Sequence, residues 1–260
     1  MSTRKREKQE ARGRRLELEA ALRERARRKR RRTSLAVAAT ALLALGGGAA
    51  AIAGGTSRTA EAPAVPPSEL APLASLGKLN PTAAPGAVGP EDVPAPDAPQ
   101  LADVGSASAS STVDGIGCQG AEQVLFHIHA HLTVFVNGTP RRIPYGIGIP
   151  SARVTPTPAG PYVAAGTCFY WLHTHAADGI IHIESPIQRT YTLGNFFDVW
   201  RQELTPTRVG RARGPVTSLY NGHVFRGNPR DIPLTKHAQI QLEVGRPLVA
   251  PVAITFPAGL

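Results

Sequence analysis

Histidine and glutamate side chains recur at alternate positions in the second half of this 260-residue chain. Neutral imidazole binds zinc, copper, nickel and iron, whereas calcium and magnesium prefer oxygen ligands. Alternate residues of a β-strand point to the same face about 6.6 Å apart, so imidazoles from neighbouring strands can converge on one ion. The sequence therefore predicts a transition-metal cofactor, copper or zinc, with seven candidate ligands: His127, His129, His131, His173, His175, His182 and Glu184.

Within this set we expect four histidines to ligate first, namely His129, His131, His173 and His175. His127 ranks next because it lies furthest from the Asn137-Gly138 turn. Glu184 either ligates the metal or accepts a hydrogen bond from the second nitrogen of a ligand. The sequence has no nucleophile elbow, zinc-protease helix or phosphate-binding loop. Glu184 is therefore a candidate catalytic base only if the protein is an enzyme.

A first hairpin is expected to carry the three histidines nearest the N-terminus. In residues 123–136 apolar side chains occupy one parity and the three histidines lie on the other, which favours a strand with one buried face. Asn137-Gly138 is typical of a tight turn between strands. We expect residues 142–149 to return as the partner strand.

A second hairpin is expected around Asp178-Gly179, which separates two β-rich stretches. A two-residue turn there would place His175 opposite His182, and His173 opposite Glu184. Opposed Cβ atoms lie about 5 Å apart, so these four side chains would share one face of the hairpin.

The remaining elements predict an α+β domain. Thr192 is typical of a helix start, and an apolar stripe with helical spacing continues to Leu204. Residues 223–226 and 238–244 are further strand candidates. We expect a small, mostly antiparallel β domain with one main helix and a β-grasp-like layout.

Two cysteines, Cys118 and Cys168, lie in the same part of the chain. A disulfide is the expected state of two cysteines in an extracytoplasmic domain. The alternative is that they are soft ligands for copper. The parity of Cys168 along its strand argues against this role, because its side chain would point away from His173 and His175.

Composition divides the chain into four segments. Residues 1–33 form a basic arm, and residues 34–55 are apolar and long enough to cross a bilayer as a helix. Residues 56–116 are rich in proline and alanine, which predicts a disordered linker. Residues 117–260 contain all the histidines, tryptophans and phenylalanines and form the expected folded domain.

The charge distribution predicts location and partners. The formal net charge of +10 is concentrated in residues 1–32, so the rest of the chain has no net charge and no nucleic-acid partner is expected. By the positive-inside rule the arm stays in the cytoplasm, and the domain lies outside a membrane spanned once by residues 34–55. A removable signal peptide is the alternative, because Ala51-Ile52-Ala53 resembles a cleavage site. Protein partners are not indicated.

Five motifs stand out in the second half of the chain: Phe126–Gly138 (FHIHAHLTVFVNG), Tyr170–His175 (YWLHTH), Gly179–Pro186 (GIIHIESP), Thr192–Trp200 (TLGNFFDVW) and Thr255–Leu260 (TFPAGL). Together they resemble a family of uncharacterised bacterial membrane-anchored or exported proteins. The resemblance extends over about residues 120–260. Ala176 departs from the acidic residue associated with that position in the family. The resemblance implies an exported location and a shared histidine-rich site, but no activity.

These observations predict a membrane-tethered, extracytoplasmic domain that handles a transition metal, with copper first and zinc next. A metal-dependent enzyme of unknown substrate is one alternative. It would require an open coordination position beside a pocket, with Glu184 within hydrogen-bond reach. An interaction module whose histidines sense pH is the other alternative. It would require dispersed imidazoles, with no three nitrogens near a common point.

Overall fold

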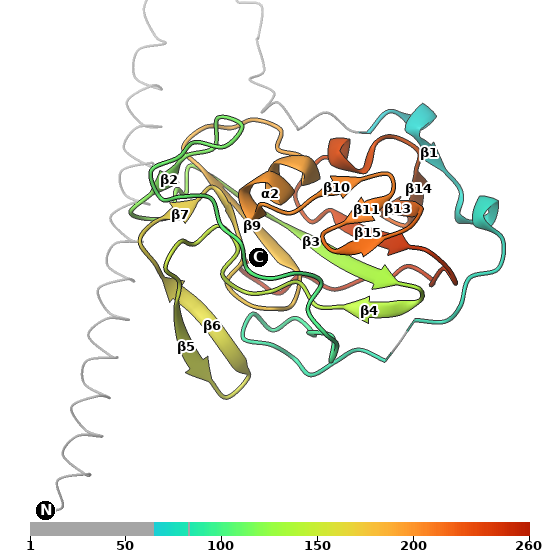
Figure 1. Cartoon of the computed structure of the whole chain (residues 1–260), viewed down its shortest axis with the longest axis horizontal. Coiled ribbons are helices and arrows are strands. Elements are labelled where there is room, and N and C mark those ends of the chain that lie inside the picture. The colour runs from blue at the N-terminus through green and yellow to red at the C-terminus, as the bar shows by residue number, and fades with distance from the viewer. Residues whose placement is uncertain (1–64, 83) are drawn as a thin grey trace, which may run out of the picture. The chain divides into compact units, whose positions relative to one another are not determined.

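An eleven-residue strand, β3 (Phe126–Val136), lies in the middle of the main sheet (Figure 1). The computed structural model describes residues 65–82 and 84–260, which belong to one compact unit, Thr59–Leu260. The predicted basic arm, membrane span and start of the linker fall within residues 1–64 and lie outside the described residues. No helix among the described residues has the length and apolar character needed to cross a bilayer.

The main sheet has eight strands in the order β1-β14-β13-β15-β3-β9-β8, with β4 also paired to β3. Its central pair, β3 and β15, is parallel, and the other strand pairs of this sheet are antiparallel. The bounds of the strands other than β3 are β1 Leu70–Ala71, β4 Thr139–Arg141, β8 Leu172–His173, β9 Ile180–Ser185, β13 Val216–Tyr220, β14 His223–Phe225 and β15 Gln239–Val244.

Smaller elements surround this sheet, and the α+β class expected from the sequence is confirmed. One α-helix and seven further short strands are described. They are α2 (Leu193–Trp200), β2 (Cys118–Gln119), β5 (Arg153–Thr157), β6 (Gly160–Ala165), β7 (Phe169–Tyr170), β10 (Leu204–Thr205), β11 (Arg208–Val209) and β12 (Ala212–Arg213). Three 3₁₀ turns complete them: η1 (Pro67–Glu69), η2 (Leu73–Leu76) and η3 (Pro229–Asp231).

Helix α2 begins where the sequence predicts. The Thr192 side chain accepts a hydrogen bond from the Asn195 N–H, and the Asn195 side chain accepts one from the Thr192 N–H. This reciprocal cap satisfies two backbone donors at the helix start. The helix ends at Trp200 rather than Leu204, because Arg201 takes a left-handed conformation and Leu204 enters β10. Its buried aromatic face packs into the hydrophobic core with the even-numbered residues of β3.

Helix α2 therefore covers one face of the sheet and leaves the histidine face to other segments (Figure 1). In β3, Ala130 and Leu132 point into the core, and by alternation the odd-numbered histidines point to the opposite face. Three segments contact the neighbouring His175 and His182: the β5–β6 hairpin, the loop containing Glu91 and the loop containing Glu122.

The two predicted hairpins need correction in register. Asn137 and Gly138 form the expected turn with positive φ angles of 51° and 73°, but the partner strand is β4, not residues 142–149. In the second hairpin, His173 rather than His175 pairs with His182. The reason is that the chain after His173 bonds to another segment: the N–H of Thr174 donates to the Ile147 carbonyl.

Residues 65–82 and 84–116 of the expected disordered linker are described, and several of them pair with later parts of the chain. Although this segment has few regular elements, β1 pairs with β14, and Asn80 and Gln100 form bridges to later parts of the chain. Its apolar side chains are sparse but buried, including Val93 and Leu101, which are 0% and 5% exposed. The Trp200 indole N–H donates to the Asp103 carbonyl. Scattered apolar anchors and backbone pairing thus hold a proline-rich segment against the domain.

Candidate metal centre

Three neighbouring strands bring histidines into one row on the sheet face opposite α2. His129 of β3 lies directly opposite His182 of β9, and His182 lies directly opposite His173 of β8. On the same two strands, two residues from the His129–His182 pair, His127 is paired with Glu184. Opposed Cβ atoms in antiparallel pairs are about 5 Å apart. The backbone register alone therefore places several ligand-type side chains within reach of each other.

We call the first cluster of donor atoms group one: His127, His129, His182 and Glu184. One ligand atom from each of these residues lies within 4.8 Å of the others. The His129 Nε2 atom is 3.1 Å from both His127 Nε2 and His182 Nδ1. The Glu184 Oε1 atom is 3.1 Å from His127 Nε2 and 3.5 Å from His182 Nδ1. Donors about 2.1 Å from one tetrahedral ion lie about 3.4 Å apart, so these separations suit a shared ion.

We call the second cluster group two: His173, His175, His182 and Glu184. The Nε2 atoms of His173 and His175 are 3.1 Å apart, and Glu184 Oε2 is 4.0 Å from His173 Nε2. All four residues are buried. Groups one and two share His182 and Glu184, so the cluster is continuous across β3, β8 and β9.

Backbone carbonyls fix which nitrogens of His173 and His175 can bind an ion. The Nδ1 atom of His173 is 2.8 Å from the Tyr170 carbonyl, and Nδ1 of His175 bonds to the Val163 carbonyl. A carbonyl oxygen only accepts, so both Nδ1 atoms carry the proton. In the neutral rings both Nε2 lone pairs face each other. Such outer hydrogen bonds orient histidine ligands in metal sites.

Burial keeps most of these imidazoles neutral, which is the form that binds metals. Burial and the neighbouring imidazoles lower the pKa of His129 to about 3. The same two causes lower the pKa of His173 well below its usual value, and burial also lowers that of His175. Because each of these rings is neutral at neutral pH, one of its nitrogens has a free lone pair, and a cation can bind there without a proton having to leave.

His182 differs from the other rings because two carboxylates contact it. Burial acts to lower its pKa, but hydrogen bonds to Glu184 and Glu91 raise it to about 9. The Nε2 atom of His182 is 2.7 Å from Glu91 Oε1, and both side chains are 6% exposed. If Nδ1 binds an ion, the Nε2–H donates to Glu91, which is the carboxylate–histidine–metal arrangement of many metal sites.

Two glutamates of the site were not predicted from the sequence. Glu91 lies in the expected linker, and Glu122 precedes β3, with Oε1 3.4 Å from His175 Nε2. The side chain of Glu122 is 39% exposed, and burial is the main cause that raises its pKa. The sequence signal for Glu91 is weak: it is one of several acids in a proline-rich stretch, and nothing local marks it as buried.

His131 does not join either group, although the sequence ranks it among the first four ligands. Its Nε2 atom is 2.9 Å from the Asp178 carbonyl, to which it donates. It lies two residues after His129 in β3 and is paired with Ile180 rather than with a ligand residue. Burial lowers its pKa to about 4, so the ring is a neutral, buried donor near the start of β9.

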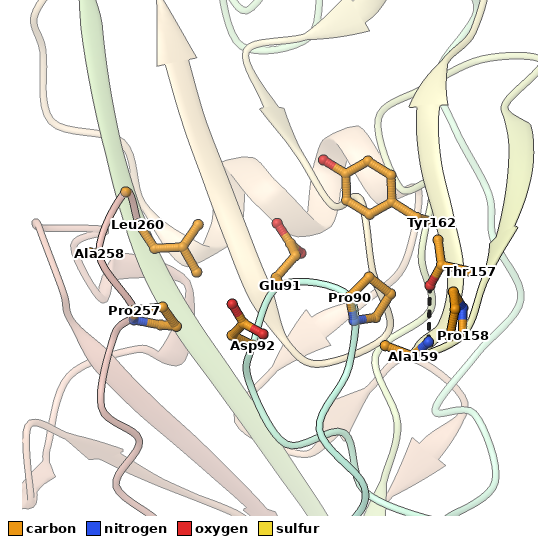
Figure 2. Close-up of a pocket in the computed structure, with 11 residues that line it drawn as sticks. Pro90, Glu91, Asp92, Thr157, Pro158, Ala159, Tyr162, Pro257, Ala258 and Leu260 are labelled. Carbon is orange, nitrogen blue, oxygen red and sulfur yellow. Dashed lines mark hydrogen bonds between the residues drawn. The ribbon is translucent and has the colours of Figure 1, made fainter. Parts of the chain in front are cut away.

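A surface hollow adjoins the cluster on the side of Glu91 (Figure 2). Its volume is about 510 Å³, and Glu91 stands in the view between Tyr162 of β6 and the C-terminal Leu260. The ring of Tyr162 stacks on His175 with centroids 5.2 Å apart. Burial and the nearby carboxylates, first Glu91, raise the pKa of Tyr162 to about 12, so its hydroxyl stays protonated. Glu91 therefore lines the hollow and also contacts His182.

The predicted disulfide between Cys118 and Cys168 is confirmed. It lies beside the β2–β7 pair, in which Cys118 is opposite Tyr170. Tyr170 supplies the carbonyl that holds His173, and Glu122 follows Cys118 in the chain. The disulfide therefore ties the Glu122 loop to the strand that orients His173, and neither cysteine is free to bind a metal.

The fold and the cluster define a β-rich domain with a buried histidine–carboxylate site able to hold a metal ion. Comparison of the chain with protein-family models, with curated proteins and with solved structures finds no match. Any statement of function therefore depends on the geometry of the site.

Proposed function

We propose that the protein binds a transition-metal ion through group one and takes part in handling that metal. The observation that carries this proposal is the convergence of three imidazoles and one carboxylate from β3 and β9 within 4.8 Å. The pH-sensing alternative required dispersed imidazoles, and this convergence argues against it. Four protein ligands also make a closed set, whereas catalytic zinc sites usually keep one position open for water or substrate.

The chemistry of the donors favours zinc or divalent copper. Imidazole nitrogen suits both ions, whereas monovalent copper prefers thiolate and thioether sulfur. Both cysteines are joined in the disulfide, and the single methionine is Met1. The described cluster therefore offers nitrogen and oxygen donors only, which argues against a site specialised for monovalent copper.

We propose that this domain works outside the cytoplasm, tethered to a membrane by residues 34–55. The disulfide supports this location, because disulfides persist in oxidising compartments. The basic run before the apolar stretch supports an N-terminus on the cytoplasmic side. Protease added to intact cells, or to spheroplasts where an outer barrier shields the protein, should cleave the domain; full protection until the membrane is lysed would refute this topology.

We also propose that the domain has a β-grasp-like layout. The strand order β9-β3-β15-β13-β14 supports it: an antiparallel pair precedes α2, a hairpin follows, and the last strand returns parallel to β3. In this layout the helix covers one face of the sheet. The histidine cluster lies on the other face, so metal binding and core packing use opposite sides of the same strands.

Metal titration of the full chain tests the proposed function. We expect zinc and divalent copper to bind, whereas calcium does not. A His129→Gln/His182→Gln variant should lose the ion bound in group one, while the matched control His223→Gln should retain it, because His223 is exposed on β14. Equal binding by the two variants, or no binding by the native chain, would overturn the proposal.

A further inference from the structure

Glu184 presents its two oxygens to different histidines. Oε1 is 3.1 Å from His127 Nε2 in group one, and Oε2 is 4.0 Å from His173 Nε2 in group two. Glu184 is 3% exposed, and Oε2 accepts no hydrogen bond from any of the described residues. A buried carboxylate oxygen without a partner is costly, and native proteins rarely keep one without a reason.

His173 and His175, beside this oxygen, also have ring nitrogens without a hydrogen-bond donor. Their Nδ1–H groups are bound to carbonyls, so their Nε2 lone pairs face each other at 3.1 Å. Two lone pairs at that distance repel unless a proton or a cation lies between them. A metal cation bound by both Nε2 atoms would satisfy the two lone pairs at once.

An ion in group one does not satisfy these atoms. It already has His127, His129, His182 and the Oε1 atom of Glu184 as a complete tetrahedral set. His173, His175 and Glu184 Oε2 then remain as a second set of three donors. Glu122 Oε1 lies 3.4 Å from His175 Nε2 on the exposed side, where it can supply a fourth.

We infer that the cluster holds two transition-metal ions at once, with the carboxylate of Glu184 bridging them. One ion binds in group one, and the second binds His173, His175, Glu184 Oε2 and Glu122. This inference rests on the proposed function and adds a second ion to it. Three carboxylates, those of Glu91, Glu122 and Glu184, contact the histidines and offset the added positive charge. A bridging carboxylate is compatible with a metal–metal separation of about 3.5–4 Å.

The number of ions per chain tests this inference directly. The full chain is loaded with Zn²⁺, freed of unbound metal, and analysed for zinc and protein. We expect two zinc ions per chain. A value of one would overturn the two-ion inference and leave the proposed function standing, whereas a value of zero would overturn both.

Paired variants and spectroscopy then locate the second ion. His173→Gln/His175→Gln should hold one zinc ion, and so should His127→Gln/His129→Gln, while the control His223→Gln holds two. Circular dichroism and an intact disulfide verify that each variant is folded. X-ray absorption of the native chain with two zinc ions should show a metal–metal distance of about 3.5–4 Å. The absence of that distance would overturn the bridge. This measurement uses the native chain, so it does not depend on any variant being folded.

Discussion

Replacing Glu91 by glutamine should weaken zinc binding in group one without changing any ligand. Glu91 Oε1 lies 2.7 Å from His182 Nε2, so it holds the ring in the orientation that turns Nδ1 toward His129. The carboxylate charge also makes the imidazole a better donor to a cation. Glutamine keeps the size of the side chain and one acceptor oxygen, so the variant removes the charge with little change in packing.

The expected loss follows from the burial of this contact. Both side chains are 6% exposed, so solvent screens the interaction only weakly. A hydrogen bond to a charged group contributes about 1.5–3 kcal/mol. Changes to such outer carboxylates typically lower metal affinity by about 10–100-fold, or about 1.4–2.8 kcal/mol. The two ranges agree, so we expect a loss within about 10–100-fold.

The loss of zinc affinity in Glu91→Gln should depend on pH. In the native protein without an ion, the pKa of His182 is raised to about 9, so its proton must leave when zinc binds at pH 7. Without the Glu91 charge that pKa is lower, and the proton competes less. The difference between the native protein and Glu91→Gln should therefore be smaller at pH 7 than at pH 9.

Competition for zinc with a coloured chelator measures both affinities at each pH. Asp92→Asn is the matched control, because Asp92 is the exposed neighbour that lines the same hollow and its loss also removes one negative charge. It should bind zinc like the native chain. If the two variants are indistinguishable, or if Glu91→Gln binds normally at pH 9, Glu91 does not orient His182 and our reasoning is wrong.

Three other variants test separate parts of the structure. Replacing Cys118 and Cys168 by serine should lower the free energy of unfolding by about 4 kcal/mol, because the disulfide closes a loop with a sequence separation of 50; an unchanged urea midpoint would contradict this. His131→Gln should keep native zinc affinity, since His131 donates to the Asp178 carbonyl outside both groups, and a loss like that of His129→Gln would make His131 a ligand. Burial raises the pKa of Glu243 from 4.5 to about 7, so its stabilising contribution is full below pH 4.5 and is lost as the pH rises through 7. Glu243→Gln should remove this loss of unfolding free energy, which is at most about 3 kcal/mol. Urea unfolding at pH 5 and pH 8 measures it, and equal pH dependence in both proteins would refute the prediction.

The sequence was informative where the determining interactions are local. Period-two alternation predicted the β3 strand, Asn137-Gly138 predicted its turn, and Thr192 predicted the start of α2. The strand candidates at residues 223–226 and 238–244 correspond to β14 and β15. Each of these features depends on neighbours within a few residues, which is the range over which backbone propensity and side-chain pattern act.

The candidate site could be predicted in its residue types but not in its connections. The register of β8 and β9 was wrong because Asp178-Gly179 ends a longer loop, whose backbone bonds to residues near Ile147. Glu91 was missed because its contact with His182 spans 91 positions and leaves no periodic pattern. His131 shares the alternation of His127 and His129, but it pairs with Ile180 and its Nε2–H donates to the Asp178 carbonyl.

The same geometry explains how group one can remain folded without an ion. His182 then carries the positive charge: its Nδ1–H donates to His129 Nε2, and its Nε2–H donates to Glu91. Burial opposes this charge, but Glu184 and Glu91 outweigh it and raise the pKa of His182 to about 9. A divalent cation that displaces this proton changes the buried charge by one unit instead of two. The two carboxylates thus have a positive partner in both states, which makes reversible exchange of the metal compatible with a stable fold.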